Sequence, residues 1–287
     1  VVKSSMPAGT YTNSVYVKAG ERSRFRLSQN IGQPDYTVDG DLTTQPPTLT
    51  NGGSADASSI EEVGNGWYRV TLTYTTVSTQ NLTLTFYSAD DEGNLFYTGD
   101  GTSGIYVWGA QLEAGSFPTS YIPTNGTEVT REPDIASMPV SEFNYNDQAG
   151  TVVVEVDSIK ADVSQRLLSI NNSANPGNER TDLLKTGSNN NIQNFTVDVG
   201  SVQTDHAVSV SGLTSFTVAA TIAADDYSMC VNGGAVVAET DGAPTVPTVD
   251  TFRLGGGLSS PLNGHIKSLK YWPQRLSDAT LQAVTQG

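Results

Sequence analysis

Glu155 and Asp157 are two carboxylates whose spacing could support acid–base chemistry. Residues at i and i+2 of a strand point to the same face, and retaining glycosidases hold two carboxyl groups about 5–5.5 Å apart. Valines alternate with these two residues, which is equally the pattern of a half-buried strand whose polar side chains face water. Ile159 and Lys160 follow where a further carboxylate would have favoured the catalytic interpretation. We therefore expect no glycoside hydrolysis, and we expect that the protein is not an enzyme.

Glycines at positions 99, 101 and 104 spell G-x-G-x-x-G, the spacing of dinucleotide-binding turns. Such a turn needs a helix after it, because the helix N-terminus meets the pyrophosphate. A strand pattern, Ile105–Gln111, follows instead. We therefore interpret this segment as a loop without a nucleotide site.

Two groups of acidic residues in turn-rich segments offer the hard oxygen ligands that calcium prefers. Neither group has the ligand spacing of an EF-hand loop, and solvated acidic loops are the alternative interpretation. We expect no required cofactor, with a structural calcium ion as the one candidate. The candidate ligands are Asp35, Asp39, Asp41, Asp90 and Asp91.

Aromatic side chains are the third source of chemistry, because a ring face can stack on the C–H groups of a sugar. Tyr36, Phe96 and Tyr97 stand in or beside predicted loops, where recognition residues concentrate. We take these three as the candidate glycan-binding residues. Trp67 and Trp108 fall in predicted strands, and we expect them to be part of the scaffold.

The overall composition excludes several classes of function. The chain has 287 residues, of which 30 are acidic and 15 basic, giving a net charge of −15. Nucleic acids and anionic lipids need clustered lysine and arginine, so we expect neither as a partner. Cys230 is the only cysteine, which rules out an intrachain disulfide. No apolar run reaches about 18 residues, so we expect no membrane insertion.

Period-two alternation is the dominant pattern and predicts antiparallel strands. Turn-forming residues fill 32–47 and 50–59, which we expect to be loops. Asn232-Gly233 predicts a hairpin turn, because both residue types tolerate positive φ. The only predicted helix covers Ser277–Thr285, capped by Ser277. The predicted strands are 11–17, 22–27, 68–74, 82–87, 105–112, 151–156, 166–170, 192–199, 215–222, 227–231, 235–239, 251–254 and 264–271.

A proline-rich stretch without periodicity, from Pro123 to about Val140, divides the strand patterns in two. We predict an all-β chain made of two tandem antiparallel β-sandwiches. The expected boundaries are a first domain at 1–124, a linker or strap at 125–145 and a second domain at 146–287.

Three segments resemble the carbohydrate-binding-module-like jelly roll of bacteriophage tail and fibre proteins. They read SVYVKAGERSRFRL at 14–27, GNGWYRVTLTYT at 64–75 and YTGDGTSGIYVWGAQLEAGSFPTSYIPT at 97–124. The resemblance implies further strands ahead of residue 14, so the jelly roll is expected to lack N-terminal strands and to have an unpaired edge. The chain begins at Val1 without methionine, and we expect it to be part of a longer protein.

The second half resembles a laminin-G or concanavalin-A-like sandwich, through GTVVVEVD at 150–157, YSMCVNGGAVVAE at 227–239 and the segment 252–282. This order of modules resembles phage tail, fibre and appendage proteins. It implies a homo-oligomeric structural protein on the virion surface that contacts other virion proteins and host cell-surface polysaccharide. The alternatives are a non-catalytic part of a polysaccharide depolymerase and a purely architectural virion decoration.

Overall fold

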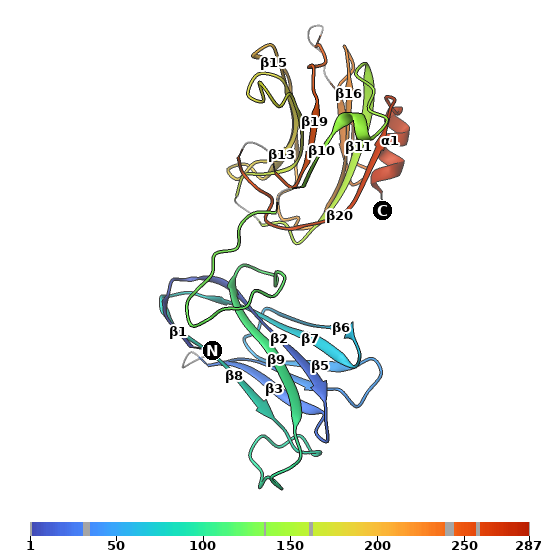
Figure 1. Cartoon of the computed structure of the whole chain (residues 1–287). Coiled ribbons are helices and arrows are strands. Elements are labelled where there is room, and N and C mark those ends of the chain that lie inside the picture. The colour runs from blue at the N-terminus through green and yellow to red at the C-terminus, as the bar shows by residue number, and fades with distance from the viewer. Residues whose placement is uncertain are drawn as a thin grey trace. The chain divides into compact units, whose positions relative to one another are not determined.

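The chain folds into two compact units, Val1–Thr130 and Arg131–Gly287, drawn in Figure 1. The computed structural model describes residues 2–30, 35–134, 136–160, 163–238, 244–256 and 259–286. Each unit is an antiparallel β-sandwich with its own hydrophobic core. The predicted architecture, an all-β chain of two tandem antiparallel sandwiches with a short C-terminal helix, is confirmed.

Unit 1 stacks a five-stranded sheet of order β1-β8-β3-β4-β5 on a four-stranded sheet of order β6-β7-β2-β9. Strand β1 lies at the edge of the first sheet, paired with β8. All five strands predicted in this half are present. The strand bounds are β1 (Val2–Met6), β2 (Gly9–Ala19), β3 (Arg24–Asn30), β4 (Tyr36–Asp41), β5 (Thr48–Gly53), β6 (Ala57–Gly64), β7 (Trp67–Thr76), β8 (Gln80–Ser88) and β9 (Ile105–Ala114).

Strands β4, β5 and β6 contradict the predicted loops at 32–47 and 50–59. Gly40 on β4 shows how a glycine in these segments can serve close packing instead of a turn. A Cβ atom on Gly40 would lie 2.1 Å from Cζ of Phe25 on the neighbouring strand β3. The Phe25 ring therefore occupies the space above Gly40, as expected for a glycine where another group approaches a strand.

The core of unit 1 follows the alternation of the strands. Val15 and Val17 of β2 point between the sheets and are at most 1% exposed, and Tyr74 of β7 is fully buried. Burial of large aromatic and branched side chains is the main stabilising term of such a sandwich. Because neighbouring residues point to opposite faces, the side chain between the two valines, Tyr16, must point away from the core.

Unit 2 stacks a six-stranded sheet, β10-β19-β12-β13-β14-β15, on a five-stranded sheet, β18-β17-β16-β11-β20. Strand β10 lies within the range predicted as a linker and pairs with β19. The predicted strand pattern is confirmed except that β10, β13 and β15 fall in segments where no strand was predicted. The bounds are β10 (Ala136–Pro139), β11 (Ala149–Asp157), β12 (Gln165–Asn171), β13 (Arg180–Lys185), β14 (Asn191–Asp198), β15 (Ser201–Ser209), β16 (Phe216–Ala223), β17 (Ser228–Val231), β18 (Val237–Ala238), β19 (Thr251–Leu254) and β20 (His265–Trp272).

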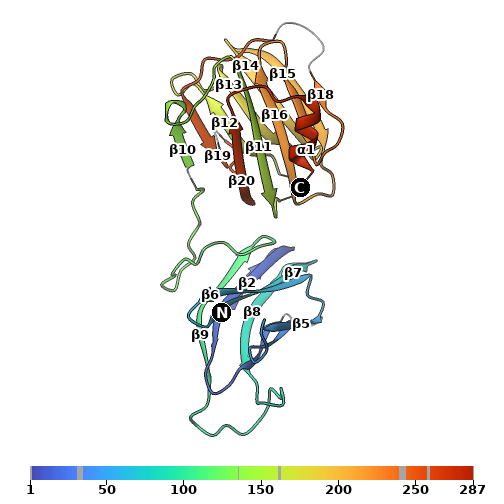
Figure 2. The ribbon, with the colours of Figure 1, turned by 90° about the vertical axis from the view of Figure 1, so that its right-hand side faces the viewer.

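Helix α1 (Asp278–Thr285) packs against the outer side of the five-stranded sheet, as Figure 2 shows. Its Leu281 is buried against Val153 and Ala219 of that sheet. The predicted cap is confirmed, because the Ser277 side chain accepts a hydrogen bond from the Thr280 N–H. Among the described residues, no helix is long and apolar enough to cross a membrane.

Candidate functional site

The outer face of the β6-β7-β2-β9 sheet carries a group of aromatic side chains. Tyr16 on the central strand β2 lies opposite Trp108 of the edge strand β9. One row along, Lys18 lies between Tyr106 of β9 and Trp67 of β7. The strand register therefore brings side chains from three segments, far apart in sequence, onto one face.

Three of these rings contact each other. The ring centroids of Tyr16 and Trp108 are 5.2 Å apart, and those of Trp108 and Tyr121 are 4.6 Å apart. Both pairs are tilted by 53°, within the range of favourable aromatic geometries. Trp108 nevertheless stays 55% exposed to solvent. The cluster is thus held in place by ring contacts while it presents a large aromatic surface to the outside.

A hollow of about 620 Å³ lies over these rings, and we call it the aromatic groove. Its lining is mostly aromatic and apolar, with the Asn65 side chain as the main polar group. Such a lining is typical of sites that bind small ligands by stacking and a few hydrogen bonds. The groove is lined by Tyr16, Val63, Gly64, Asn65, Trp67, Trp108 and Tyr121.

Tyr121 reaches the groove because the segment Gly115–Ile122, which we call the strap, folds back over the same sheet. The Ile122 N–H donates to Gln111 Oε1 over 2.9 Å, and the Thr119 N–H donates to Glu113 Oε2 over 3.0 Å. Arg69 donates to the Thr119 carbonyl over 2.6 Å. These bonds fix the strap across the strands β9 and β7 and hold Tyr121 beside Trp108.

Gly109 is the residue that lets the rings pack closely. It has φ of +62° in the middle of β9, where the pairing with β2 shifts register. A Cβ atom there would lie 3.0 Å from the Tyr16 ring and 3.4 Å from the Tyr121 ring. A glycine meets both demands, a left-handed backbone and a close ring approach.

The three residues predicted to bind glycans do not form one face. Tyr36 is only 6% exposed, its ring stacks on Tyr74, and its hydroxyl donates to the Thr75 carbonyl over 2.8 Å. Tyr36 is therefore a core residue. The sequence interpretation placed it at the surface because its strand β4 was taken for a loop. Phe96 is 88% exposed on the loop between β8 and β9.

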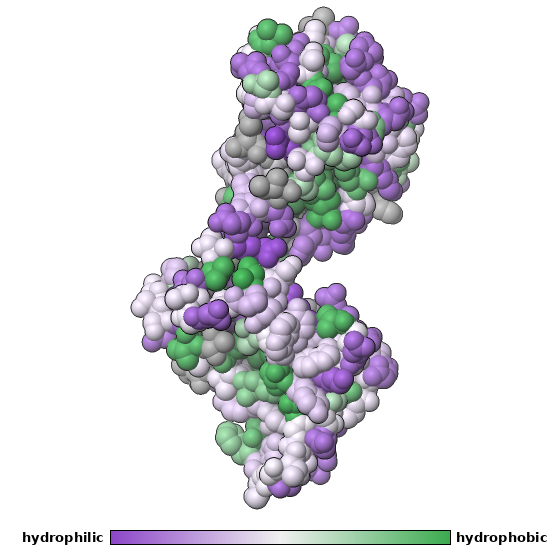
Figure 3. Space-filling model, in the orientation of Figure 1, coloured by the Kyte–Doolittle hydropathy of each residue, from purple (hydrophilic) through white to green (hydrophobic). Residues whose placement is uncertain are grey.

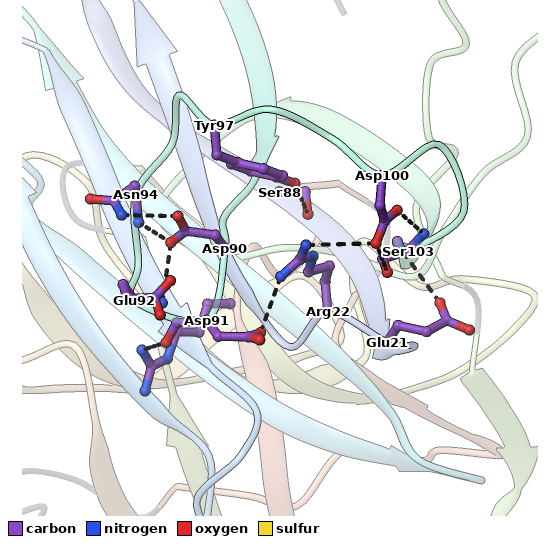
Figure 4. A network of polar contacts seen from close by, with 12 residues as sticks. Glu21, Arg22, Ser88, Asp90, Asp91, Glu92, Asn94, Tyr97, Asp100 and Ser103 are labelled. Carbon is purple, nitrogen blue, oxygen red and sulfur yellow. Dashed lines mark hydrogen bonds and ion pairs between the residues drawn. The ribbon is translucent and has the colours of Figure 1, made fainter.

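Tyr97 lies on the same loop but is held by its neighbours (Figure 4). The Arg22 guanidinium lies 5.2 Å from the Tyr97 ring centroid, and the Tyr97 hydroxyl donates to Ser88 Oγ over 3.3 Å. These contacts cover part of the ring.

Four of the five predicted calcium ligands have other partners for their carboxylates in this structure. Arg26 binds both carboxylate oxygens of Asp39, at 2.6 and 2.7 Å, and Arg24 binds Asp41 at 2.9 Å. The Asp41 pKa is lowered, first by the hydrogen bond from Thr43. These two carboxylates already have their charge compensated on the neighbouring strand.

The carboxylates of Asp90 and Asp91 are likewise engaged, and Asp35 differs from them. Asp90 accepts from the backbone N–H of Asn94 over 2.7 Å, and Asp91 forms an ion pair with Arg22 at 3.3 Å (Figure 4). The Asp35 backbone carbonyl accepts from the Ser54 N–H over 3.1 Å, whereas its carboxylate Oδ1 is buried without a hydrogen-bond partner among the described residues. Among the described residues, no group of three or more His, Cys, Asp or Glu is arranged to hold a metal ion. Calcium at these residues stays a prediction.

Glu155 and Asp157 lie on β11 with ordinary strand partners. Ser268 donates to Glu155 over 3.2 Å, and Ser215 and Lys267 contact Asp157. The hydrogen bond from Ser215 is the main cause that lowers the Asp157 pKa. A general acid for glycoside cleavage needs a raised pKa, so Asp157 has the wrong electrostatic environment for that role.

The exposed Trp108 is the main functional candidate that the sequence interpretation missed. Trp67 and Trp108 were expected to be scaffold, yet Trp108 and Tyr106 are 55% and 59% exposed. The usable signal was the alternation of inward and outward side chains along β2. The valines on both sides of Tyr16 point inward, so Tyr16 points outward. The register of β9 against β2 then decides which side chains of β9 face out with Tyr16.

Unit 2 also has a hollow, of about 790 Å³, formed by residues 140–145, 147–148 and 246–249. Its two aromatic residues are Phe143 and Tyr145, and both pack their rings against Tyr271 in the core. Burial raises the pKa of the Tyr145 hydroxyl well above its usual value. These rings offer less free surface than those of the aromatic groove.

Comparisons with known proteins yielded only remote structural likenesses. No protein-family model and no curated protein matches the chain. A solved CBM40 module of the Ruminococcus gnavus IT-sialidase, bound to alpha2,3 sialyllactose, is 23% identical over 49% of this chain and 84% of its own, with a TM-score of 0.41. The NanB sialidase of Streptococcus pneumoniae is 19% identical over 52% of this chain and 26% of its own, with a TM-score of 0.44.

Domains LG4-5 of the mouse laminin alpha1 chain are 11% identical, with a TM-score of 0.37, and cover 94% of this chain and 85% of theirs. At TM-scores below 0.5, these likenesses carry no argument about the site. The case for a function therefore rests on the geometry of the chain's own residues.

Proposed function

We propose that this chain is a non-enzymatic glycan-binding protein and that the aromatic groove is its binding site. The observation that carries the proposal is the exposed ring of Trp108, held against Tyr16 and Tyr121 at the groove. A flat apolar ring in water is a ready stacking surface for the C–H face of a sugar. The groove also offers hydrogen-bonding groups at its margin, in Asn65 and the tyrosine hydroxyls.

The rings of the groove are pre-ordered, which favours binding. Each ring in the Tyr16–Trp108–Tyr121 cluster contacts a neighbour, and the strap is fixed by hydrogen bonds. A side chain that is already immobile loses little conformational entropy when a ligand arrives. Figure 3 shows hydrophilic residues over much of the visible face of each unit, with groups of apolar residues among them.

The biological setting that we propose is the surface of a bacteriophage virion, on a tail, fibre or appendage. The support is the resemblance of segments 14–27, 64–75 and 97–124 to phage modules. A homo-oligomer among other virion proteins would bind host polysaccharide weakly at each site and gain avidity from many copies. A non-catalytic part of a depolymerase and a purely architectural decoration are the competing proposals.

A comparison of two surface aromatics tests the groove. The Trp108→Ala variant is expected to lose about tenfold in affinity for a glycan that the unaltered protein binds, since a lost stacking contact of about 1.4 kcal/mol corresponds to that factor. Phe96→Ala removes an even more exposed ring, 88% exposed, that does not line the groove. It is expected to bind like the unaltered protein. Immobilised host polysaccharides and a glycan array supply the ligands.

Each alternative has its own outcome. Loss of binding in Phe96→Ala but not in Trp108→Ala would move the site to the loop between β8 and β9. Absence of binding to every glycan, with the protein presented at high valency, would favour the architectural proposal. New reducing ends or unsaturated sugars after incubation would identify an enzyme.

A further inference from the structure

Lys18 is an uncommitted cation on the face that carries the aromatic groove. Every other lysine and arginine that the structure describes in Val1–Thr130 has an oxygen partner, and no such partner contacts Lys18. The partnered cations bind carboxylates, except Arg69, which donates to Ser14 and Thr119. In a chain with twice as many acidic as basic residues, a free ammonium group at this place is unusual.

The position of Lys18 is set by the strand register. Its cross-strand neighbours are Trp67 on one side and Tyr106 on the other, so the side chain stands in a row of aromatic residues. Its stem lies against the turn between β6 and β7, since a Cβ atom on Gly66 would be 3.6 Å from Lys18 Cε. The same turn contributes Gly64 and Asn65 to the groove lining. The ammonium group, one bond beyond Cε, therefore lies close to the turn whose Gly64 and Asn65 line the groove.

We infer that the glycan bound in the aromatic groove is acidic and that Lys18 binds its carboxylate. The inference rests on the proposed function and names the class of its ligand. A sugar stacked on the rings would place a ring substituent at the groove margin, where the ammonium group is free to form an ion pair. Lys18 thereby selects carboxylate-bearing polysaccharides over neutral ones.

The other cation on this face cannot take that role. Arg69 lies with its guanidinium 5.4 Å from the Tyr16 ring centroid, and its Nη2 donates to Ser14 Oγ and to the Thr119 carbonyl. Its Nε is buried. The side chain thus positions the strap and supports the Tyr16 ring. In the next row, Glu61 lies opposite Arg69, and its carboxylate would repel an anion there. The row of Lys18 is therefore the favourable place for an anion.

The net charge of −15 does not prevent this recognition. At physiological ionic strength, charges more than about 8 Å apart are largely screened. The preference of the groove for an acidic or a neutral sugar therefore depends on the charges within that distance of the bound carboxylate. Long-range repulsion slows the association of a polyanion, and the contact with Lys18 favours the acidic form once the sugar is in the groove.

Matched pairs of polysaccharides test the inference with the full chain. The probes are hyaluronan, alginate and polygalacturonate, each beside its carboxyl-reduced form, together with an array of neutral glycans. We expect the unaltered protein to prefer the acidic member of a pair, and Lys18→Gln to reduce its affinity for that member by about threefold to fivefold, the range of an exposed ion pair. The carboxyl-reduced form should bind the variant and the unaltered protein equally. Raising the salt concentration should weaken only the binding of the acidic polysaccharide, which depends on Lys18.

Lys270→Gln is the matched control, since it removes the same charge from an exposed position on β20 of unit 2. Retained preference in Lys18→Gln, or Trp108-dependent binding of neutral glycans only, would overturn the acidic ligand and leave the proposed function standing. Absence of binding to all acidic and neutral probes would instead count against the proposed function itself. Chondroitin sulfate is added as a sulfated probe, and a preference for it that survives carboxyl reduction would identify a sulfate as the anion and overturn the carboxylate assignment.

Discussion

Gly109 illustrates how much of the site depends on a single residue without a side chain. It combines a backbone with φ of +62° with an approach of 3.0 Å between its missing Cβ and the Tyr16 ring. The proposed binding role therefore belongs to the aromatic neighbours, while the glycine permits their arrangement. At this scale, a residue can be essential for recognition without touching a ligand.

Replacing Gly109 by alanine separates backbone strain from ring displacement. Gly109→Ala is expected to cost about 1–3 kcal/mol of stability for the strained backbone, and to weaken glycan binding because the Tyr16 and Tyr121 rings must move. Gly126→Ala is the control, since Gly126 has φ of +81° but nothing within 4 Å of its Cβ position. Chemical denaturation and binding titrations measure the two effects. Equal loss of binding in both variants would show that the rings are not the cause.

At the scale of elements, the strap is what turns a flat sheet into a groove. The Glu113 carboxylate accepts from the Thr119 N–H and from Gln111 Nε2, and Gln111 Oε1 accepts from the Ile122 N–H. These bonds run from the edge strand β9 to the segment that follows it. The position of Tyr121 in the groove therefore depends on two side chains outside it.

Glu113→Ala should loosen the strap while the sandwich stays folded. Hydrogen exchange over residues 115–122 is expected to become faster, because the amide of Thr119 loses its acceptor. Glycan affinity should fall severalfold as Tyr121 leaves its place beside Trp108. Glu132→Ala, at an exposed residue outside the strap, provides a control of equal charge change. Unchanged exchange in Glu113→Ala would contradict the role of this carboxylate.

Sequence patterns predicted a strand more reliably where one face of the strand is apolar than where a glycine lets a neighbouring side chain pack closely against it. Strands β2, β7 and β9 show clear alternation and were predicted, whereas β4, which carries Gly40 and Asp39, was taken for a loop. The missing information was non-local: Phe25 fills the space above Gly40. The same error placed Tyr36 on a loop surface, although its ring stacks in the core.

The candidate site was hidden for a related reason. Alternation alone puts Tyr106 and Trp108 on one side of β9, but the side that is covered depends on which strands and loops lie there. Only the register with β2 and the course of the strap determine that Trp108 is exposed. Phe96 and Tyr97 could be placed in a loop from sequence, because glycines and aspartates surround them.

At the scale of the whole molecule, each unit has a separate hydrophobic core. The core of unit 1 contains Tyr74 and Val17, and that of unit 2 contains Val154 and Leu168. Separate cores predict that each unit unfolds as a cooperative block of its own. Glycan binding in the aromatic groove should therefore be insensitive to the stability of unit 2.

A core substitution in unit 2 tests this independence. Val154 is fully buried on β11, and Val154→Ala is expected to destabilise unit 2 by about 2 kcal/mol. Calorimetry should then show one melting transition shifted down and a second unchanged. The affinity for glycan, measured at a temperature where both units are folded, should equal that of the unaltered protein. A single transition that shifts as a whole would contradict two independent blocks.

The distribution of the three tryptophans gives the chain a built-in optical label. Trp67 and Trp108 line the aromatic groove, while Trp272 packs near helix α1 in unit 2. Light emitted by the indole of the half-exposed Trp108 depends on its contact with water, and a sugar stacked on that ring replaces the water. Occupancy of the groove can thus be followed by intrinsic fluorescence on unlabelled protein, with Trp272 as an internal reference.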